Sequence, residues 1–167
     1  MNDITDDWFW EGNVQKNIAR FMETDQGYEI RKLANTKAKQ RGPDIEAVKS
    51  GIEIVGEVKG YPSIYYSGDY PGGKKGDLKP TRPIVQAKIW VSHAIFKIIQ
   101  IKSNQVKLNA SSIEIALGFP DFAIYRELME NISWFRGIIK LGCYFVNKTE
   151  VLYYDANQPI ELPGRNL

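Results

Sequence analysis

Residues 42–60 of this chain run GPDIEAVKSGIEIVGEVKG. The two apolar runs in this stretch, 44–48 and 52–59, are rich in Ile and Val, which favour strands. The pair Ser50-Gly51 between them is typical of a tight turn, so the two runs are expected to form a hairpin. The sequence therefore predicts two paired strands of a sheet in this region.

Three charged side chains are expected to meet at one end of this hairpin. Side chains two residues apart on a strand point to the same face, so Glu57 and Lys59 share a face with Val55 before them. Asp44 opens the first strand, and the hairpin returns the chain beside it. Two carboxylates and an ammonium group therefore converge where the second strand ends and a cleft can open.

This trio has the chemistry that phosphodiester hydrolysis needs. Asp44 and Glu57, with a backbone carbonyl such as that of Val58, offer hard oxygen ligands to Mg²⁺. A divalent ion polarises the phosphoryl oxygen and relieves the repulsion between the carboxylates. Lys59 is placed to hold or activate the attacking water and to oppose the negative charge that develops.

Hydrophobic periodicity predicts the rest of the fold outward from this hairpin. Asp121 is expected to cap the third predicted helix and Gly142 to close it. The element order predicts an α/β fold, a mixed β-sheet flanked by helices, in a single domain over 1–167 with 155–167 as an extended C-terminal arm. Helices are expected over 7–23, 84–101 and 121–139, and further strands over 28–33, 112–117, 143–146 and 151–154.

The segment 61–82 is a long connection rich in Gly, Pro, Tyr and Lys, which is typical of a functional loop. Part of it nearly matches a phosphate-binding loop, but Lys75 stands where Ser or Thr would hold Mg²⁺, so no nucleotide cofactor is expected. Its aromatic and basic side chains, with a basic run before the hairpin, suit contacts to DNA. The predicted DNA-binding residues are Lys37, Lys39, Arg41, Tyr65, Tyr66, Lys74, Lys75, Lys79 and Arg82.

Pro43-Asp44, followed after twelve residues by Glu57-Val58-Lys59, resembles the PD-(D/E)XK signature of the restriction-endonuclease-like nuclease superfamily. The predicted element order is also similar to that family's core. The resemblance implies a restriction-endonuclease-like core and a Mg²⁺-dependent deoxyribonuclease, with Mn²⁺ as a substitute ion. The trio described above would then be its catalytic set.

The same resemblance implies roles for residues on two helices. Many members carry an acidic metal ligand on the first helix, and Glu11 fits because it recurs with Val14 and Ile18 on the apolar face. Gln15, one turn later, is a companion candidate. Some members place a catalytic Gln on the helix after the catalytic strand, and Gln86 matches that position.

The resemblance leaves the biological form of the enzyme open. A restriction-type, a structure-selective and a partner-targeted DNA endonuclease all fit, and cutting both strands favours a homodimer or a subunit of a larger nuclease assembly. The alternative from another class is a catalytically silent nucleic-acid-binding or assembly protein that retains the nuclease fold. An RNA-processing nuclease is a third interpretation, because its metal chemistry is the same.

Composition excludes several other classes of site. One cysteine, Cys143, in an apolar run predicts a buried thiol and rules out a Cys-rich zinc site. The single histidine, His93, falls on the polar face of its helix and is expected to be solvated. The formal charge of +2 neither requires nor excludes DNA. An acidic N-terminus and the lack of an apolar stretch near the length of a membrane span predict a cytoplasmic protein without a membrane.

Overall fold

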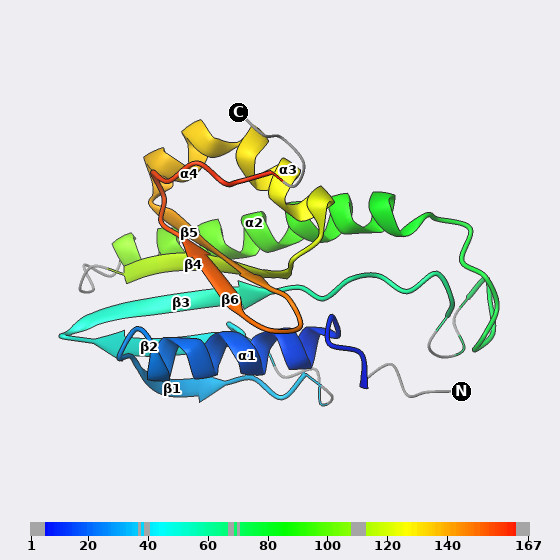
Figure 1. The fold of residues 1–167 in the computed structure, drawn as a ribbon, viewed down its shortest axis with the longest axis horizontal. Coiled ribbons are helices and arrows are strands. Elements are labelled where there is room, and N and C mark those ends of the chain that lie inside the picture. Colours follow the sequence, from blue (N-terminus) through cyan, green and yellow to red (C-terminus); the bar gives the residue numbers. More distant parts are fainter. Residues whose placement is uncertain are drawn as a thin grey trace.

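The computed structural model describes residues 6–36, 38, 41–66, 69, 71–107 and 113–162. In this part of the chain, six strands form one mixed open sheet in chain order, β1-β2-β3-β4-β5-β6. Helix α1 covers one face of the sheet, and α2, α3 and α4 cover the other (Figure 1). The molecule is therefore a single three-layer α/β domain.

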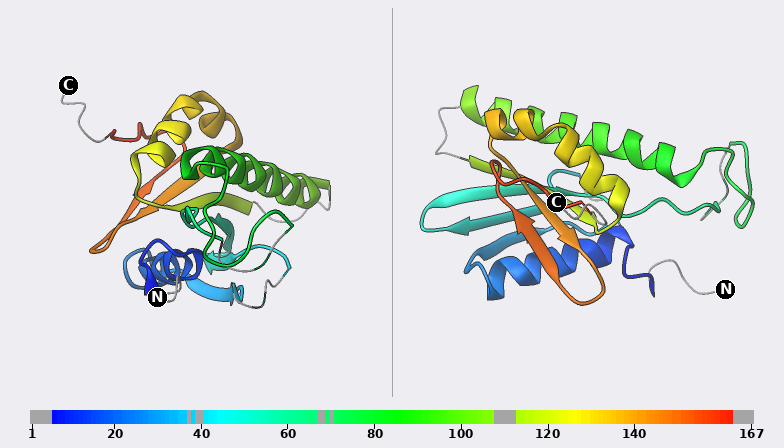
Figure 2. Two further views of the ribbon diagram at one scale, coloured as in Figure 1. Left: turned by 90° about the vertical axis from the view of Figure 1, so that its right-hand side faces the viewer. Right: turned by 45° about the horizontal axis from the view of Figure 1, so that its top comes forward.

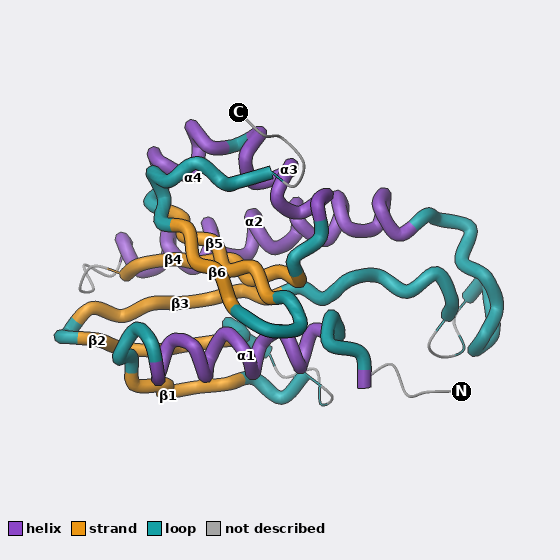
Figure 3. The backbone as a smooth tube through the Cα atoms, in the orientation of Figure 1, coloured by secondary structure: helices purple, strands orange, loops and turns teal. Residues whose placement is uncertain are grey.

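The elements have well-defined bounds (Figure 3). The helices are α1 (Glu11–Thr24), α2 (Pro83–Lys107), α3 (Ala123–Asn131) and α4 (Ser133–Ile139). The strands are β1 (Glu29–Leu33), β2 (Ile45–Lys49), β3 (Ile52–Val58), β4 (Ile113–Pro120), β5 (Leu141–Val146) and β6 (Val151–Tyr154).

The turn at Ser50-Gly51 sets the geometry of the sheet around β3. Both residues have positive φ, 50° and 79°, which is the conformation that closes a two-residue hairpin. β2 and β3 consequently pair antiparallel, as do β1 with β2 and β5 with β6. β3, β4 and β5 run parallel to one another, because α2 and then α3 and α4 carry the chain back across the sheet.

Alternate residues of β3 pack into two separate hydrophobic cores. Ile54 and Val58 pack with Val14 and Ile18 of α1, and all four are at most 2% exposed. Val55 points the other way, into the core beneath α2. Burial of each aliphatic side chain stabilises the fold by roughly 1.5–3 kcal/mol, so a shift of β3 by one residue would be costly. The alternation therefore fixes the face of the sheet to which each later side chain of β3 points.

Most predicted elements are confirmed, with shifted ends. The first helix starts at Glu11 rather than residue 7, because a turn precedes it in which the Trp10 amide donates to the Asp7 carbonyl at 3.0 Å. α2 extends to Lys107, six residues beyond the predicted end. On α2 the expectation that His93 is exposed is confirmed, and the apolar Ile84 in its first turn is also 45% exposed.

The third predicted helix is wrong in its details. It breaks at Ile132 into α3 and α4, and Lys140, with φ 55°, ends α4 in the left-handed conformation. Gly142 lies inside β5 rather than closing a helix. Asp121 caps nothing, because its carboxylate accepts hydrogen bonds from the Arg126 guanidinium at 2.5 and 2.8 Å.

β4 and the C-terminal segment also differ from simple expectation. The strand predicted to stop at residue 117 continues through Gly118 to Pro120. Residues 155–162, the described part of the predicted arm, lie against α3 and α4. There the Ile160 amide donates to Glu130 at 2.8 Å, and Arg136 donates to the Asp155 carbonyl at 2.7 Å.

One helical stretch in the described chain, Pro83–Asn104 of α2, is long and apolar enough to cross a membrane by length and composition alone. This corrects the expectation that no stretch approaches that length. The evidence for a membrane is weak, because Ala87, Val91, Ala94 and Ile98 pack on the sheet with 4% exposure or less. One side of α2 therefore contributes to the core beneath it.

Candidate active site

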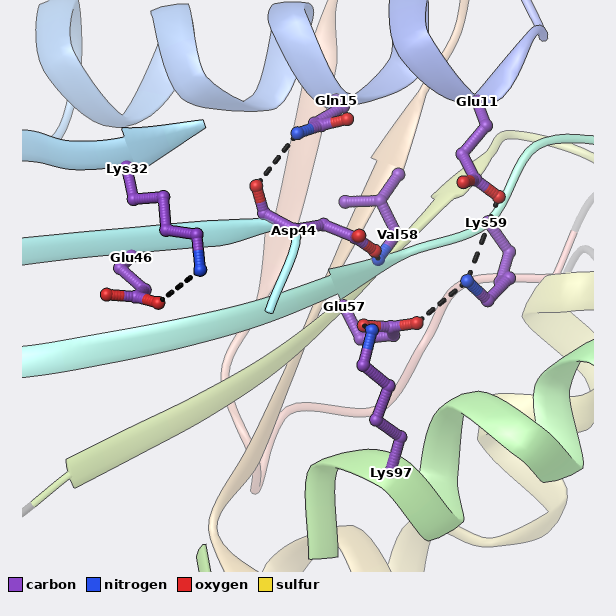
Figure 4. Close-up of polar contacts among 9 residues, drawn as sticks. All are labelled: Glu11, Gln15, Lys32, Asp44, Glu46, Glu57, Val58, Lys59 and Lys97. Carbon is purple, nitrogen blue, oxygen red and sulfur yellow. Dashed lines mark hydrogen bonds and ion pairs between the residues drawn. The ribbon is translucent and has the colours of Figure 1, made fainter. Parts of the chain in front are cut away.

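The end of β3, the first turn of α1 and the middle of α2 bring charged side chains together (Figure 4). Lys59 lies just past the end of β3, and its Nζ is 2.7 Å from Oε1 of Glu57 and 3.7 Å from Oε2 of Glu11. Lys97 Nζ in α2 is 2.5 Å from Oε2 of Glu57. The four residues form a continuous network of alternating charge that joins both helical layers at one end of the sheet.

Asp44 is fixed beside this network by the hairpin. Its amide donates to the Gly56 carbonyl at 3.1 Å, and its Oδ2 accepts the amide of Val58 at 2.7 Å. The second bond orients the carboxylate toward the end of β3. The predicted role of the Val58 carbonyl as a metal ligand stays a prediction.

Gln15 of α1 holds the backbone of Asp44. Its side chain is 2% exposed, and Nε2 donates to the carbonyls of Asp44 at 2.8 Å and Ala34 at 2.9 Å. Its Oε1 accepts the Thr36 hydroxyl at 2.7 Å. These three hydrogen bonds go to two backbone carbonyls and a hydroxyl, and none goes to a charged side chain. Gln15 therefore positions Asp44 and does not join Glu11 in the charged network.

Burial makes the carboxylates of this network hard to ionise. Desolvation is the main cause that raises the pKa of Glu57, which is 2% exposed, and the charge of Asp44 adds to it while Lys59 opposes it. Desolvation also raises the pKa of Glu11, with Lys59 again opposing. Burial alone would lower the pKa of Lys59, but Glu11 and Glu57 outweigh it and raise that pKa. Lys59 is therefore an ammonium ion at neutral pH.

Gly60 allows α1 to approach the end of β3 closely. A Cβ at this position would lie 2.6 Å from the amide nitrogen of Glu11. The contact is secured by the Tyr61 amide, which donates to the Phe9 carbonyl at 3.1 Å, and by the Tyr125 hydroxyl, which donates to the Gly60 carbonyl at 2.7 Å. This close passage places Glu11 next to Lys59.

A cleft of about 540 Å³ adjoins the charged network, and Glu11 and Gly60 belong to its wall. Its other walls come from the segment before α1, from the β3–α2 connection and from the first turns of α2. The left view of Figure 2 looks onto this end of the molecule, with α1 and α2 on opposite sides of the connection.

Four of the five predicted catalytic residues come together: Asp44, Glu57, Lys59 and Glu11. The fifth, Gln86, does not reach this group. Its Nε2 donates to the Thr81 carbonyl at 2.7 Å, its Oε1 lies 3.5 Å from Lys79 Nζ, and it lines the adjoining cleft.

The predicted DNA-binding residues divide into three groups. Tyr66 and Lys79 line the cleft. The exposed residues are Arg41, Tyr65, Lys74, Lys75 and Arg82, on the surface of the same loops. Lys37 and Lys39 lie outside the described residues.

Lys97 is the residue that the sequence prediction missed. It was not among the predicted catalytic, metal-binding or DNA-binding residues. Its position three helical turns after Gln86 was the available signal, since residues so spaced lie on one side of a helix. That side faces the end of β3.

No known family model matches this chain, and neither a curated protein nor a solved structure does. Within the described residues, no three acidic, His or Cys side chains already cluster closely enough to hold a metal ion. The site must therefore be judged on its own geometry.

Proposed function

We propose that this protein is a metal-dependent endonuclease that hydrolyses DNA phosphodiester bonds at the Asp44, Glu57 and Lys59 cluster. The observation that carries the proposal is the position of Lys59, which is 2.7 Å from Glu57 and 3.7 Å from Glu11 at the open end of the sheet. A buried carboxylate and a half-buried one around the Lys59 ammonium group, beside a cleft, are costly to maintain for structure alone. The spacing of the trio and the α/β topology support a restriction-endonuclease-like core.

The donor set fits a divalent cation. Oε2 of Glu57 is buried, and the ammonium group of Lys97 lies 2.5 Å from it. An oxygen in that condition already faces a positive charge. Mg²⁺ commonly binds through one or two carboxylates and keeps several waters, so a preformed cage of three acidic side chains is unnecessary.

Asp44 and Glu57 would hold Mg²⁺, or Mn²⁺ in its place, with the Val58 carbonyl and Glu11 as further ligands. When bound, the ion would polarise the scissile phosphate and offset the repulsion among the carboxylates. Lys59 would donate hydrogen bonds to the attacking water and to the phosphate oxygens. In the net reaction, water adds to phosphorus, the bond to the leaving oxygen breaks, and that oxygen gains a proton.

The alternative function is a catalytically silent nucleic-acid-binding protein that keeps this fold. One observation favours it: both oxygens of Glu57 are already neutralised, by Lys59 and Lys97. Such a network is electrically satisfied without a metal. An RNA-processing nuclease shares the proposed chemistry and is separated by substrate alone.

A cleavage assay tests the proposal. Supercoiled, linear and four-way-junction DNA, and a matched RNA, are incubated with Mg²⁺, Mn²⁺ or EDTA. We expect metal-dependent cutting of DNA that falls by on the order of 10²-fold or more in Asp44→Asn and Lys59→Met proteins. The control is Glu46→Gln, which removes a carboxylate from β2 that pairs with Lys32 away from the site. Folded protein that cuts nothing with either metal would favour the silent binding protein.

The preferred substrate in this assay also chooses among the restriction-type, structure-selective and partner-targeted forms. A homodimer or a larger assembly remains a prediction, which sedimentation with and without DNA will test.

A further inference from the structure

We propose that the cleft beside the charged network binds one unpaired nucleotide of the substrate strand, so that the enzyme acts on DNA with unpaired bases. This inference rests on the proposed function and adds a substrate class to it. It starts from the cleft's composition, volume and position, none of which the cluster of carboxylates requires.

Aromatic side chains from three separate segments line the cleft. They are Trp10 before α1, Tyr61 and Tyr66 in the β3–α2 connection, and Trp90 in α2. Aromatic rings offer stacking surfaces to any nucleobase, a contact that tolerates every sequence. Tyr61 also packs against the core beneath α2, whereas Trp10, Tyr66 and Trp90 are half-buried and belong to neither core, which leaves ring surface for a planar ligand.

These rings are held in place. A Cβ at Gly12 would lie 2.1 Å from the Trp10 ring, so that ring packs directly on the first turn of α1. The Tyr61 ring lies 4.3 Å from that of Phe122, centre to centre, within an aromatic cluster. Rigid stacking groups bind at little entropic cost.

The loop that carries Tyr66 is also built rather than loose. The Tyr66 amide donates to the Asp77 carbonyl at 2.9 Å, and the Lys79 amide donates to the Ile64 carbonyl at 2.8 Å. A Cβ at Gly73 would lie 2.2 Å from the Tyr66 ring, so this glycine makes room for the ring. The aromatic wall is therefore preformed.

Polar groups in the cleft suit the rest of a nucleotide. Lys79 supplies a positive charge for a phosphate, and its Nζ lies 3.5 Å from Oε1 of Gln86. Gln86 is anchored through Nε2 to the Thr81 carbonyl at 2.7 Å. Glu11 and Gly60 join this wall to the charged network, so a nucleotide in the cleft has its neighbouring phosphate next to Lys59.

Volume and shape select the ligand. A cleft of about 540 Å³ falls within the range that accepts one small organic group. A base that is stacked and paired inside a duplex cannot present its face to these rings, whereas an unpaired base can. Strand ends, single strands, junctions and mismatches are consequently favoured over continuous duplex.

Equilibrium binding in EDTA tests the inference without any cleavage. The probes are a fluorescent oligo-dT strand and a duplex whose two ends are each closed by a non-nucleotide linker, so that it holds no unpaired base, and binding is followed by anisotropy. We expect the single strand to bind more tightly, and Trp90→Ala and Lys79→Ala each to weaken its binding by about tenfold or more. Trp134→Ala is the matched control, because Trp134 lies on α4 and is 68% exposed. Thermal unfolding verifies that each variant is folded. If Trp90→Ala does not fold, Lys79→Ala alone tests the cleft.

Tighter binding of the closed duplex, or an equal effect of Trp90→Ala and Trp134→Ala, would overturn the cleft proposal. The outcome is independent of the nuclease proposal. Trp90-dependent binding of oligo-dT by a protein that cuts nothing supports the cleft and contradicts the nuclease. Metal-dependent cutting of closed duplex that is indifferent to Trp90→Ala does the reverse.

Discussion

The ammonium group of Lys97 in α2 lies 2.5 Å from Oε2 of Glu57 in β3, while Lys59 lies 2.7 Å from Oε1 of the same carboxylate. A single buried glutamate is thus neutralised from two sides by lysines of different elements. The two lysines differ in exposure, since the side chain of Lys59 is 18% exposed and that of Lys97 is 38% exposed. Lys97 is therefore the more easily displaced of the two.

Replacing Lys97 by Met should have opposite effects on stability and on metal binding. Without metal, the free energy of unfolding should fall by about 1–2 kcal/mol, less than for a fully buried pair because Lys97 is partly solvated and Lys59 remains. With Mg²⁺, binding should become tighter, because an ammonium group no longer competes for Oε2. Urea unfolding and isothermal titration calorimetry measure the two effects. Lys88→Met, at an exposed position of the same helix, should change neither.

The stability of the metal-free protein should depend on pH through Glu57 and Glu11. Their folded-state pKa values are raised above the ordinary 4.5, mainly by desolvation. A group with a raised pKa takes up a proton on folding, so its contribution is most favourable below 4.5 and is lost as pH rises through the raised value. Lys59, whose pKa is also raised, keeps its contribution throughout this range and loses it only in strong alkali.

A comparison of wild type with Glu57→Gln isolates the Glu57 contribution. Urea unfolding in EDTA at about pH 5 and about pH 7.5 should show wild type gaining stability relative to the variant at the lower pH. A stability difference that is the same at both pH values would contradict the assignment of a raised pKa to Glu57.

Gln15→Leu should lower both stability and cleavage, because Gln15 holds the backbone of Asp44. The variant keeps the volume of the side chain but leaves the carbonyls of Ala34 and Asp44 without its two hydrogen bonds. Buried unsatisfied groups cost roughly 1–3 kcal/mol each, so we expect a loss of about 2–4 kcal/mol in urea unfolding. Cleavage at saturating Mg²⁺ should also fall because Asp44 moves. Asn17→Leu, on the exposed side of α1, is the control and should leave both properties nearly unchanged.

Metal addition should stabilise wild type and not Asp44→Asn. Binding to the folded state alone contributes RT ln(1 + [L]/Kd), about 2.7 kcal/mol at a hundredfold excess over Kd. Ca²⁺ is a useful probe because it takes the same oxygen ligands. Thermal unfolding with increasing Ca²⁺ or Mg²⁺, reversed by EDTA, measures this effect. Equal shifts in wild type and in Asp44→Asn would place the ion elsewhere.

Local pattern was sufficient for the part of the site that lies on one hairpin. The alternation of β3 put Glu57 on the face of Val55, and the turn at Ser50-Gly51 brought Asp44 alongside. Both relationships depend only on strand geometry and a two-residue turn. Glu11 was also placed correctly, because the helical spacing of Val14 and Ile18 determines which side of α1 faces the sheet.

The remaining errors come from contacts between distant segments. Helical spacing puts Lys97 on the same side of α2 as Gln86, but Lys97 reaches Glu57 only because α2 crosses the sheet at a particular height, which that spacing does not encode. Asp121 is of a residue type that often caps helices, but it pairs with Arg126, which also donates to Tyr154 and to the Glu161 carbonyl. The bond between Asp121 and Arg126 is local, but the long-range contacts of Arg126 hold its guanidinium where Asp121 meets it, in place of a cap worth roughly 1 kcal/mol.

The close passage of Gly60 beneath the first turn of α1 links the site to the order of folding. β2 and β3 are neighbours in sequence and can pair early, whereas Glu11 reaches Lys59 only after the N-terminal segment has docked. Before that docking, the carboxylate of Glu11 is not close to Lys59 and Glu57. The charged network is complete only when α1, β3 and α2 are all in place, so a partly folded molecule has an incomplete network.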